Sequence, residues 1–526
     1  MEKKNLPIGI QDFQILRTSN CIYVDKTELI HRLITEGYYY FLSRPRRFGK
    51  SLLISTIKEI FLGNKDLFEG LWIYDKWDWS KTNPVIHLSF SSIDYQNLGL
   101  ARGISSELKT IALKHNIVLN SDSFKEQFKE LIQALNAQYG SVVILIDEYD
   151  KPMIDYLEYE KLPQAKENQA IMKTFYSVLK DAAPYLRLVF ITGVSKFSKV
   201  SIFSDLNHLD DLTLHPNYTT LTGYTQEELA FYFDDYLQSA SERLKMSRMD
   251  LGERVREWYN GFSWDGTNTV YNPFGTLQFL AQSDFRNFWA ETGTPTFLLE
   301  QMKKRQRFDF ENAITTSDLL NKYDISNLEI IPLLFQTGYL TVKKRDFLNG
   351  QIVLDYPNRE VRSSFYGFLI DELTPNQNSP YATVAVYDLQ NMFLNNDLDG
   401  VKNIIGTLFS DLPYDLYAQN KDKKKEIEMS ERFFHGIIHL IFKYLGIYIK
   451  SEVHSSNGRA DSVVETPTHV YIFEFKYNRS GKAAMDQLKR NNYADPYRTS
   501  GKTIVGIGVN FSHITRKING WKVEIL

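Results

Sequence analysis

The triplet Gly49-Lys50-Ser51 is the first group of residues whose types and spacing suggest a specific chemistry. It follows the apolar run YYYFL and opens an amphipathic stretch, so we expect a strand, a loop and a helix start in that order. Amide groups at such a helix start bind phosphate, a lysine reaches the outer phosphates, and a serine hydroxyl ligates Mg²⁺. We therefore predict that nucleotide is bound by the loop and helix start Arg47, Phe48, Gly49, Lys50, Ser51 and Leu52.

The match to the phosphate-loop pattern is incomplete. Arg44 stands where that pattern has its first glycine, and Pro45 follows it. The sequence therefore does not establish that this loop folds as an ordinary phosphate loop. A strand-turn-helix crossing with an incidental lysine is the alternative interpretation.

Acidic residues end the apolar run VVILIDE, as expected of the strand that accompanies a phosphate loop. Asp147 is predicted to hold the metal through water, and Glu148 to orient and deprotonate the attacking water. A further apolar run, 186–192, ends in Thr192, which we expect to contact the γ-phosphate, with Ser195 nearby. A basic side chain is expected to stabilise the negative charge of the transition state. The sequence offers four candidates and does not distinguish among them: Arg46, Arg47, Lys196 and Lys199.

A third group of residues lies near the C-terminal end, in two β-rich runs around a turn at 466–469. If Glu465 pairs with Val470, then Asp461 lies opposite Glu474, about 5 Å away on the same face. Lys476 shares that face. Two opposed carboxylates repel, so we predict a bound Mg²⁺, with Lys476 orienting the attacking water and stabilising charge during phosphodiester hydrolysis.

Other residues surround this hairpin. Glu431 opens an apolar helix and is expected to supply a further carboxylate to the metal, and Gln487 follows the hairpin on another helix. His435 and His439 lie one helical turn apart, but satisfied imidazoles on a helix face are the more ordinary reading of that spacing.

The elements that position the nucleotide residues alternate between strands and helices, as in a parallel sheet with crossover helices. Strands are expected at 38–42, 85–90, 142–147 and 186–192, and helices near Lys50, Leu98, Ser123 and Gln169. The additional strand between the two nucleotide-binding strands predicts a P-loop NTPase sheet of order 5-1-4-3-2, within an α/β fold.

Beyond residue 224 the pattern becomes mainly helical, which suggests a lid. Residues 331–356 read as a helix followed by two strands, either a winged helix or a connector. A second helical patch and a charge run, KDKKKE, precede the last domain. The predicted division is 1–224 P-loop domain, 225–375 lid and winged-helix-like region, 376–424 helical connector, and 425–526 nuclease-like α/β domain resembling restriction endonucleases.

Composition narrows the class of protein. The 526 residues include 43% hydrophobic and 24% charged ones, as in ordinary globular proteins, and the length suggests several domains. One cysteine, Cys21, excludes intramolecular disulfides and cysteine-built zinc sites. No apolar run is long enough for a membrane span, so we expect a cytoplasmic protein. The net charge of -3 neither supports nor excludes nucleic-acid binding.

The ordered motifs of this chain resemble those of a bacterial family of AAA-ATPase-like proteins with a C-terminal PD-(D/E)XK nuclease domain. The resemblance covers nearly the whole chain and rests on YVDKTELI, RPRRFGKSLL, VVILIDEYDKP, ITGVSKFSKVSIFSDLNHLDDLTL, WYNGF, VYNPFG, LLFQTGYLT, YPNREVRSSF, GRAD and FEFK. It implies ATP binding through Lys50 and Ser51 and metal handling through Asp147. It also implies nuclease roles for Glu431, Asp461, Glu474 and Lys476, with Gln487 as auxiliary. Ala460 replaces the proline of the superfamily's name.

Two functions are compatible with these residues. The first is an ATP-regulated or ATP-driven, Mg²⁺-dependent nuclease acting on DNA in defence against, or mobilisation of, foreign elements. The second is a nucleotide-dependent switch whose C-terminal domain only binds nucleic acid or a protein partner. The presence of Asp461, Glu474 and Lys476 together favours the enzyme. The sequence does not distinguish DNA from RNA, nor does it indicate an oligomeric state.

Overall fold

The computed structural model describes residues 3–196, 203, 206, 208–289, 302, 308–321, 329–373, 382–410, 423–446, 449–453, 460–512, 515 and 517–526. The chain divides into two compact units. Unit 1 comprises Met1–Leu298 and Phe310–Val361, and unit 2 comprises Leu299–Asp309 and Arg362–Leu526.

Unit 1 is built on a five-stranded parallel sheet of order β2-β3-β4-β1-β5. Its strands are β1 (Tyr39–Ser43), β2 (Val85–Ser89), β3 (Val142–Asp147), β4 (Leu186–Gly193) and β5 (Asp210–Asp211). Read from the other edge this is 5-1-4-3-2, so the predicted order is confirmed. The four long strands coincide with the predicted ones to within a residue at each end. β3 and nearly all of β4 are buried, and buried parallel strands are continuous apolar runs.

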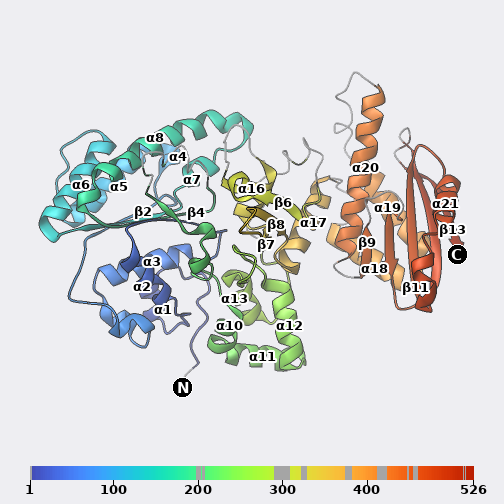
Figure 1. Cartoon of the computed structure of the whole chain (residues 1–526), viewed down its shortest axis with the longest axis horizontal. Helices are drawn as coiled ribbons and strands as arrows, with labels where there is room; N and C mark the ends of the chain where they lie inside the picture. The colour runs from blue at the N-terminus through green and yellow to red at the C-terminus, as the bar shows by residue number, and fades with distance from the viewer. Residues whose placement is uncertain are drawn as a thin grey trace. The chain divides into compact units, whose positions relative to one another are not determined.

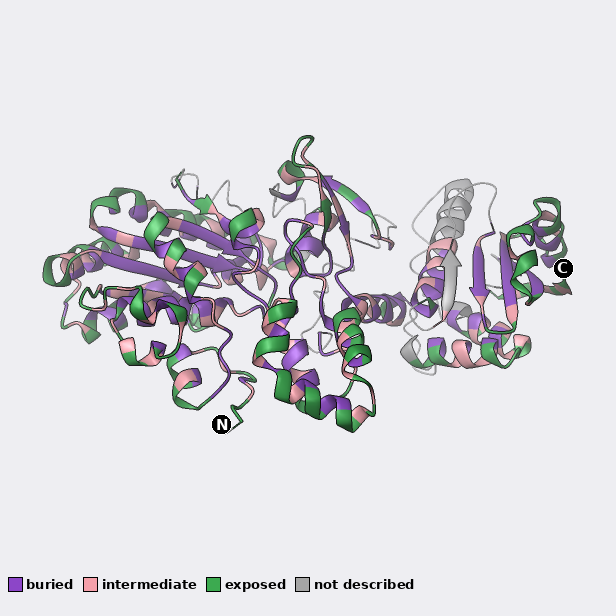
Figure 2. Ribbon diagram, turned by 60° about the horizontal axis from the view of Figure 1, so that its bottom comes forward, coloured by how far each residue is buried: buried purple, intermediate pink, exposed green. Residues whose placement is uncertain are grey.

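Helices cover both faces of this sheet (Figure 1). One face packs on α1 (Phe13–Thr18), α2 (Thr27–Glu36) and α3 (Lys50–Phe61), the other on α5 (Leu100–Lys114), α6 (Phe124–Tyr139) and α8 (Leu162–Asp181). Figure 2 shows the sheet strands mostly in purple, as buried residues. Two predicted helix starts need adjustment. The short α4 (Tyr95–Leu98) ends at Gly99, whose φ of +78° lets the chain turn before α5, and α8 begins at Leu162 rather than near Gln169.

The predicted lid consists of α10 (Gln226–Tyr232), α11 (Asp234–Leu244), α12 (Arg248–Tyr259) and α13 (Pro273–Gln282). Local sequence fixes where the helices begin. Thr225 and Glu228 form a capping box at α10, and the Asn272 side chain caps α13 ahead of Pro273. Their apolar faces meet in one core that also takes Ile22 and Val24 of the N-terminal segment.

A three-stranded antiparallel sheet of order β6-β8-β7 completes unit 1. Its elements are β6 (Ala313–Thr316), α15 (Ser317–Asn321), α16 (Ile330–Thr337), β7 (Thr341–Arg345) and β8 (Gln351–Asp355). The predicted helix and hairpin are present. A further strand, β6, which the sequence did not indicate, pairs with β8 at the edge of the sheet. The order of elements is that of a winged helix. Most of α16 is buried, however, so this helix presents little surface that could enter a DNA groove.

Unit 2 contains a mixed sheet of order β13-β12-β11-β10-β9. Its strands are β9 (Lys450–Val453), β10 (Ser462–Glu465), β11 (His469–Tyr477), β12 (Thr503–Phe511) and β13 (Ile518–Ile525). The helices are α18 (Ala382–Leu394), α19 (Leu398–Ser410), α20 (Lys423–Leu445) and α21 (Gly481–Arg490), while α17 (Arg359–Leu373) spans the division between the units. Phe393 of α18 and Phe442 of α20 both contact Phe473 of β11.

The predicted four-part division is finer than these two units, and its boundaries stay predictions. The helices of the predicted connector, α18 and α19, lie in unit 2, and α18 packs on the sheet through Phe393. No helix within the described ranges has both the length and the apolar composition that crossing a bilayer requires.

Candidate active sites

The phosphate loop leads from β1 into α3, as the sequence predicts. Gly49, at the N-cap of α3, has a φ of +81°, a conformation that a glycine adopts without strain. Apart from Gly49 itself and its two chain neighbours, no described residue has an atom within 4 Å of where a Cβ would stand at Gly49. The space beside Gly49, at the start of α3, is therefore open, as a phosphate cradle requires.

Lys50 is held inside this loop by main-chain carbonyls. Its Nζ donates hydrogen bonds of 2.9 Å to the carbonyl oxygens of Arg44 and Pro45, and the residue is only 6% exposed. Burial lowers the pKa of Lys50, while the carboxylates of Asp147, Asp150 and Glu148 act in the opposite direction. Lys50 thus lies close to the acidic end of β3, where the metal of a nucleotide would be bound.

Arg44, the residue that departs from the phosphate-loop pattern, is completely buried. Its Nη1 donates to the carbonyl oxygens of Ser43 and Thr213 at 2.9 Å, and its Nη2 to that of Tyr218 at 3.2 Å. The guanidinium also lies 3.8 Å from the ring centroid of Trp264, and burial lowers the pKa of Arg44 to about 9. Arg44 therefore ties the loop to later segments, a role that the sequence pattern alone did not reveal.

The end of β3 brings Asp147, Glu148 and Thr192 together. The Thr192 hydroxyl donates to Asp147 Oδ1 at 2.6 Å, and the Glu148 amide donates to the same oxygen at 3.0 Å. Glu148 has a φ of +52°, in the left-handed region that strains a residue with a side chain. Its pKa is raised by burial and then by the charge of Asp147. A carboxyl with a raised pKa at such a position fits the predicted general base.

Asp150 is a buried carboxylate that sequence reasoning missed. Its Oδ2 accepts hydrogen bonds from the Val194 amide at 3.0 Å, the Ser195 amide at 2.6 Å and the Ser195 hydroxyl at 2.7 Å. Asp150 therefore fixes the chain just beyond β4 relative to the end of β3. The only signal in the sequence was a third acid, three residues after Asp147.

The structure also places the candidate cations. Lys196 Nζ lies 2.9 Å from Asp211 Oδ2 in a pair that is nearly inaccessible on the lysine side. The Arg47 guanidinium stacks 3.6 Å from the ring centroid of Phe274, and Arg46 is exposed. Lys199 lies outside the described residues.

The hairpin of unit 2 has the predicted register, with Glu465 opposite Val470. Its turn is closed by the Thr466 amide, which donates to the His469 carbonyl at 2.8 Å. The paired residues run from Glu465 and Val470 to Ser462 and Phe473, so the predicted register of the hairpin is confirmed. Asp461 lies just before β10, and its amide donates to the Phe473 carbonyl at 3.1 Å. The direct opposition of Asp461 and Glu474 on one face stays a prediction.

Asp461, Glu474 and Lys476 form a polar cluster at the end of the hairpin, in which Glu474 is buried and the other two are half-buried. Asp461 Oδ2 accepts from the Phe475 amide at 2.8 Å, and Lys476 Nζ donates to Glu474 Oε1 at 2.7 Å. The other oxygen, Glu474 Oε2, is buried and has no hydrogen-bond partner among the described residues. An ionised carboxylate oxygen in that position is costly unless a cation or a proton compensates it.

The charges of this cluster are only partly compensated. Burial, and then the charge of Asp461, raise the pKa of Glu474 to about 7, although Lys476 opposes this change. Burial also raises the pKa of Asp461, against the hydrogen bond from the Phe475 amide. Two carboxylates with an unpartnered oxygen are a donor set that suits a hard divalent cation such as Mg²⁺. The residues present therefore fit the implied metal.

The remaining predicted residues are placed less closely. Glu431 lies in α20, within the stretch whose side chains fall outside the described set. Gln487 lies half-buried on α21, which packs on β11 and β12, and its side chain makes no hydrogen bond within the described ranges. His439 is satisfied by Asp309 at 2.8 Å, as a helix-face histidine. The described residues contain no cluster of three or more His, Cys, Asp or Glu side chains suited to a metal.

Comparison with known proteins adds four similarities. Residues 7–203 match a family described as predicted AAA-ATPase, and residues 429–521 match the PD-(D/E)XK nuclease superfamily. An uncharacterized protein in the vnfD 5' region of Azotobacter chroococcum mcd 1 is 38% identical over 536 residues, covering 100% of both chains. The Aeropyrum pernix ORC1 protein, solved in complex with DNA, is 12% identical and gives a TM-score of 0.24, over 65% of this chain and 90% of that one. A TM-score this low supports no argument about the fold.

Proposed function

Because this chain belongs to the predicted AAA-ATPase-like proteins that carry a C-terminal PD-(D/E)XK nuclease domain, we propose that it hydrolyses ATP and cleaves DNA with Mg²⁺. The two domain matches support an ATPase-like module fused to a nuclease-like one. Binding of DNA, dependence on Mg²⁺, a cytoplasmic location and a role in defence or mobile-element biology belong to the proposal.

One observation carries the nuclease half. Glu474 Oε2 is buried without a hydrogen-bond partner in the described part of the chain, beside a second carboxylate and a lysine. A surface that only bound nucleic acid would gain nothing from such an arrangement, because the negative charges would repel phosphate. Mg²⁺, when bound, supplies a Lewis acid that polarises a phosphoryl oxygen. Asp461 and Glu474 would hold it, with Glu431 as the further predicted ligand.

Lys476 has a separate role in this proposal. Its ammonium is paired with Glu474 at 2.7 Å. Once a cation compensates Glu474, the ammonium can orient the attacking water and stabilise the charge that develops on the phosphate. Gln487 is kept as an auxiliary residue of this site.

At the proposed ATP site, the phosphates are bound by the amides at the start of α3 and by the Lys50 ammonium. The loop residues Arg47 and Phe48 also take part in binding the nucleotide. Ser51 and Asp147 hold the Mg²⁺ of the nucleotide. Glu148 accepts the proton of the attacking water, and Thr192 contacts the γ-phosphate. What supports this assignment is the open space at Gly49 and the position of Lys50 beside three carboxylates.

The decisive experiment incubates the full-length protein with supercoiled plasmid, single-stranded DNA and RNA, with Mg²⁺ or EDTA and with or without ATP. Asp461→Asn and Glu474→Gln should abolish cleavage, since each removes a ligand oxygen charge. Glu465→Gln is the matched control, because Glu465 lies on the same hairpin and pairs with Lys502 at 3.4 Å. Cleavage of RNA alone would change the substrate. Nucleic-acid binding without cleavage by the wild type would leave the nucleotide-dependent binding protein as the function.

A further inference from the structure

The segment Leu333–Thr341, with the sequence LLFQTGYLT, has no part in the chemistry described so far. It covers the end of α16, a turn and the first residue of β7. Nearly all of it is buried, including the polar side chains of Gln336 and Thr341. Buried polar groups normally form hydrogen bonds, and here the partners are Lys196 beyond β4, Leu320 of α15 and Ser263 beyond α12.

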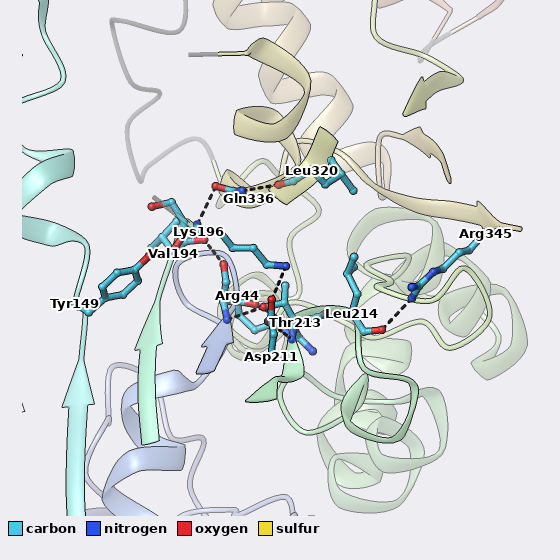
Figure 3. Close-up of polar contacts among 12 residues, drawn as sticks. Arg44, Tyr149, Val194, Lys196, Asp211, Thr213, Leu214, Leu320, Gln336 and Arg345 are labelled. Carbon is cyan, nitrogen blue, oxygen red and sulfur yellow. Dashed lines mark hydrogen bonds and ion pairs between the residues drawn. The ribbon is translucent and has the colours of Figure 1, made fainter. Parts of the chain in front are cut away.

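The first contact joins Gln336 to the chain beyond β4 (Figure 3). Gln336 is 3% exposed, its Oε1 accepts from the Lys196 amide at 3.1 Å, and its Nε2 donates to the Leu320 carbonyl at 3.3 Å. Lys196 in turn reaches Asp211 of β5. Because β4 and β5 flank β1 on its two sides, this lysine spans the end of β1, where the phosphate loop begins.

The second contact is a close approach of main chain to the loop itself. Gly338 has a φ of +91°, and a Cβ at this position would lie 2.8 Å from Pro45 Cβ and 2.9 Å from Pro45 Cγ. The carbonyl of Pro45 is one of the two that hold Lys50. The turn after α16 thus rests directly on the residue that positions the phosphate-binding lysine.

The third contact runs through Thr341 and the residues beside it. The Thr341 hydroxyl accepts from the Ser263 amide at 2.6 Å and donates to the Ser263 carbonyl at 2.8 Å. The next residue, Trp264, carries the ring that faces the Arg44 guanidinium and lies 5.6 Å from the ring of Phe48. A movement of the phosphate loop would therefore also displace the start of β7, through Trp264 and Ser263.

We propose that Gln336 is a positioning residue of the nucleotide site, and that the segment Leu333–Thr341 couples the phosphate loop to the three-stranded unit 313–355. Gln336 holds the main chain of Lys196, whose side chain reaches Asp211 past the end of β1. Gly338 packs against Pro45 of the loop, and Thr341 holds Ser263, next to Trp264. ATP hydrolysis then depends on a unit that contributes no group to the phosphates. The inference rests on the ATP half of the proposed function.

Coupling of this kind is reciprocal, since a unit that affects nucleotide binding or its geometry must respond when nucleotide binds. ATP bound at the loop should therefore slow amide hydrogen exchange in Gly338–Val342. A contact that was merely structural would leave this exchange independent of nucleotide. The two cases differ in a measurable way.

The test compares Gln336→Met, which keeps the side-chain length but lacks the acceptor oxygen, with Gln127→Met. Gln127 is equally buried, on α6, and donates to the Ser121 carbonyl at 2.7 Å. Loss of a positioning contact should lower kcat for ATP by about 10- to 100-fold with little change in KM, because the reacting groups are misplaced while binding persists. Gln336→Glu retains an acceptor for the Lys196 amide and should restore most of kcat. The control should behave as the wild type.

Hydrogen exchange is measured in the Glu148→Gln background, with ATP and Mg²⁺ present or absent, after calorimetry has established binding. Protection of Gly338–Val342 by ATP, and its loss in Gln336→Met, is the expected result. If the protein binds ATP and this segment shows no response, or if Gln336→Met keeps the kcat of the control, the coupling is refuted while the ATPase stands. If the wild type binds no ATP, the ATP half of the function is refuted, and the coupling with it.

Discussion

Replacing Glu474 by Gln should stabilise the metal-free protein above neutral pH. Burial and the charge of Asp461 raise the pKa of Glu474 from an ordinary 4.5 to about 7. The folded protein therefore retains a proton that the unfolded chain releases between these values. The contribution of Glu474 to stability is highest below pH 4.5, falls as the pH rises to about 7, and is level beyond it. The difference of about 2.5 pH units corresponds to about 3 kcal/mol.

The glutamine that replaces Glu474 in the variant carries no charge at any pH, so this loss disappears. In EDTA, we expect the free energy of unfolding of Glu474→Gln, relative to that of the wild type, to increase by about 3 kcal/mol as the pH rises from 4 to 8. Native-state hydrogen exchange of the β11 and β12 amides measures it, because these central strands report the opening of unit 2. Mg²⁺ at about 100 times its Kd should then stabilise the wild type alone by about 2.7 kcal/mol at pH 8.

Glu524→Gln provides a control of opposite sign. Hydrogen bonds from Lys489 and Lys522 lower the pKa of Glu524 to about 2, so its carboxylate stabilises the fold above its unfolded pKa, and this contribution is lost as the pH falls. The reasoning is refuted if Glu474→Gln is less stable than wild type at pH 8 in EDTA. It is also refuted if the free energy of unfolding depends on pH in the same way for Glu474→Gln and the wild type from pH 4 to pH 8.

Three further predictions concern unit 1. Glu148→Gln should bind ATP with unchanged affinity in calorimetry and lose its turnover, since only the proton acceptor is removed; unchanged hydrolysis would exclude Glu148 as the base. Gly193→Ala should destabilise the unit by about 3 kcal/mol or more in denaturant unfolding, because the new Cβ would lie 2.5 Å from a ring carbon of Tyr149. Arg44→Met should lower the free energy of unfolding by about 2 to 4 kcal/mol in the same measurement, because buried carbonyls such as that of Thr213 lose their donor. An unchanged free energy would mean that burying the charge of Arg44 costs as much as its hydrogen bonds contribute.

The sheet of unit 1 and the hairpin register of unit 2 were predictable because both follow from local patterns. VVILID is a strand buried on both faces, and a four-residue turn sets Glu465 opposite Val470 and Ser462 opposite Phe473 by counting alone. Short elements gave no such signal. β5 has two residues and takes its place only by pairing with β1, and β6 is recognisable only through its pairing with β8.

The residues that sequence reasoning missed act through contacts distant in the chain. Arg44 donates to the carbonyl of Tyr218, 174 positions away, and Gln336 accepts from the amide of Lys196 across 140 positions. Arginine and glutamine are ordinary surface residues, so nothing in their local sequence predicts burial. Asp150 is similar, because its partners, the amides beyond β4, are defined only once the sheet has formed.

The division of the chain has a consequence for its synthesis on the ribosome. Leu299–Asp309 belongs to unit 2, whereas the chain that follows it returns to unit 1 before unit 2 resumes at Arg362. Asp309 bonds to His439, 130 residues later, and Phe308 lies against Gly436. At about 5 to 20 residues per second, the earlier segment emerges roughly 7 to 26 s before its partner helix. For that interval the apolar side chains of Met302 and Phe308 are available to chaperones or to a wrong partner. A fragment that started at Arg362 would lack them altogether.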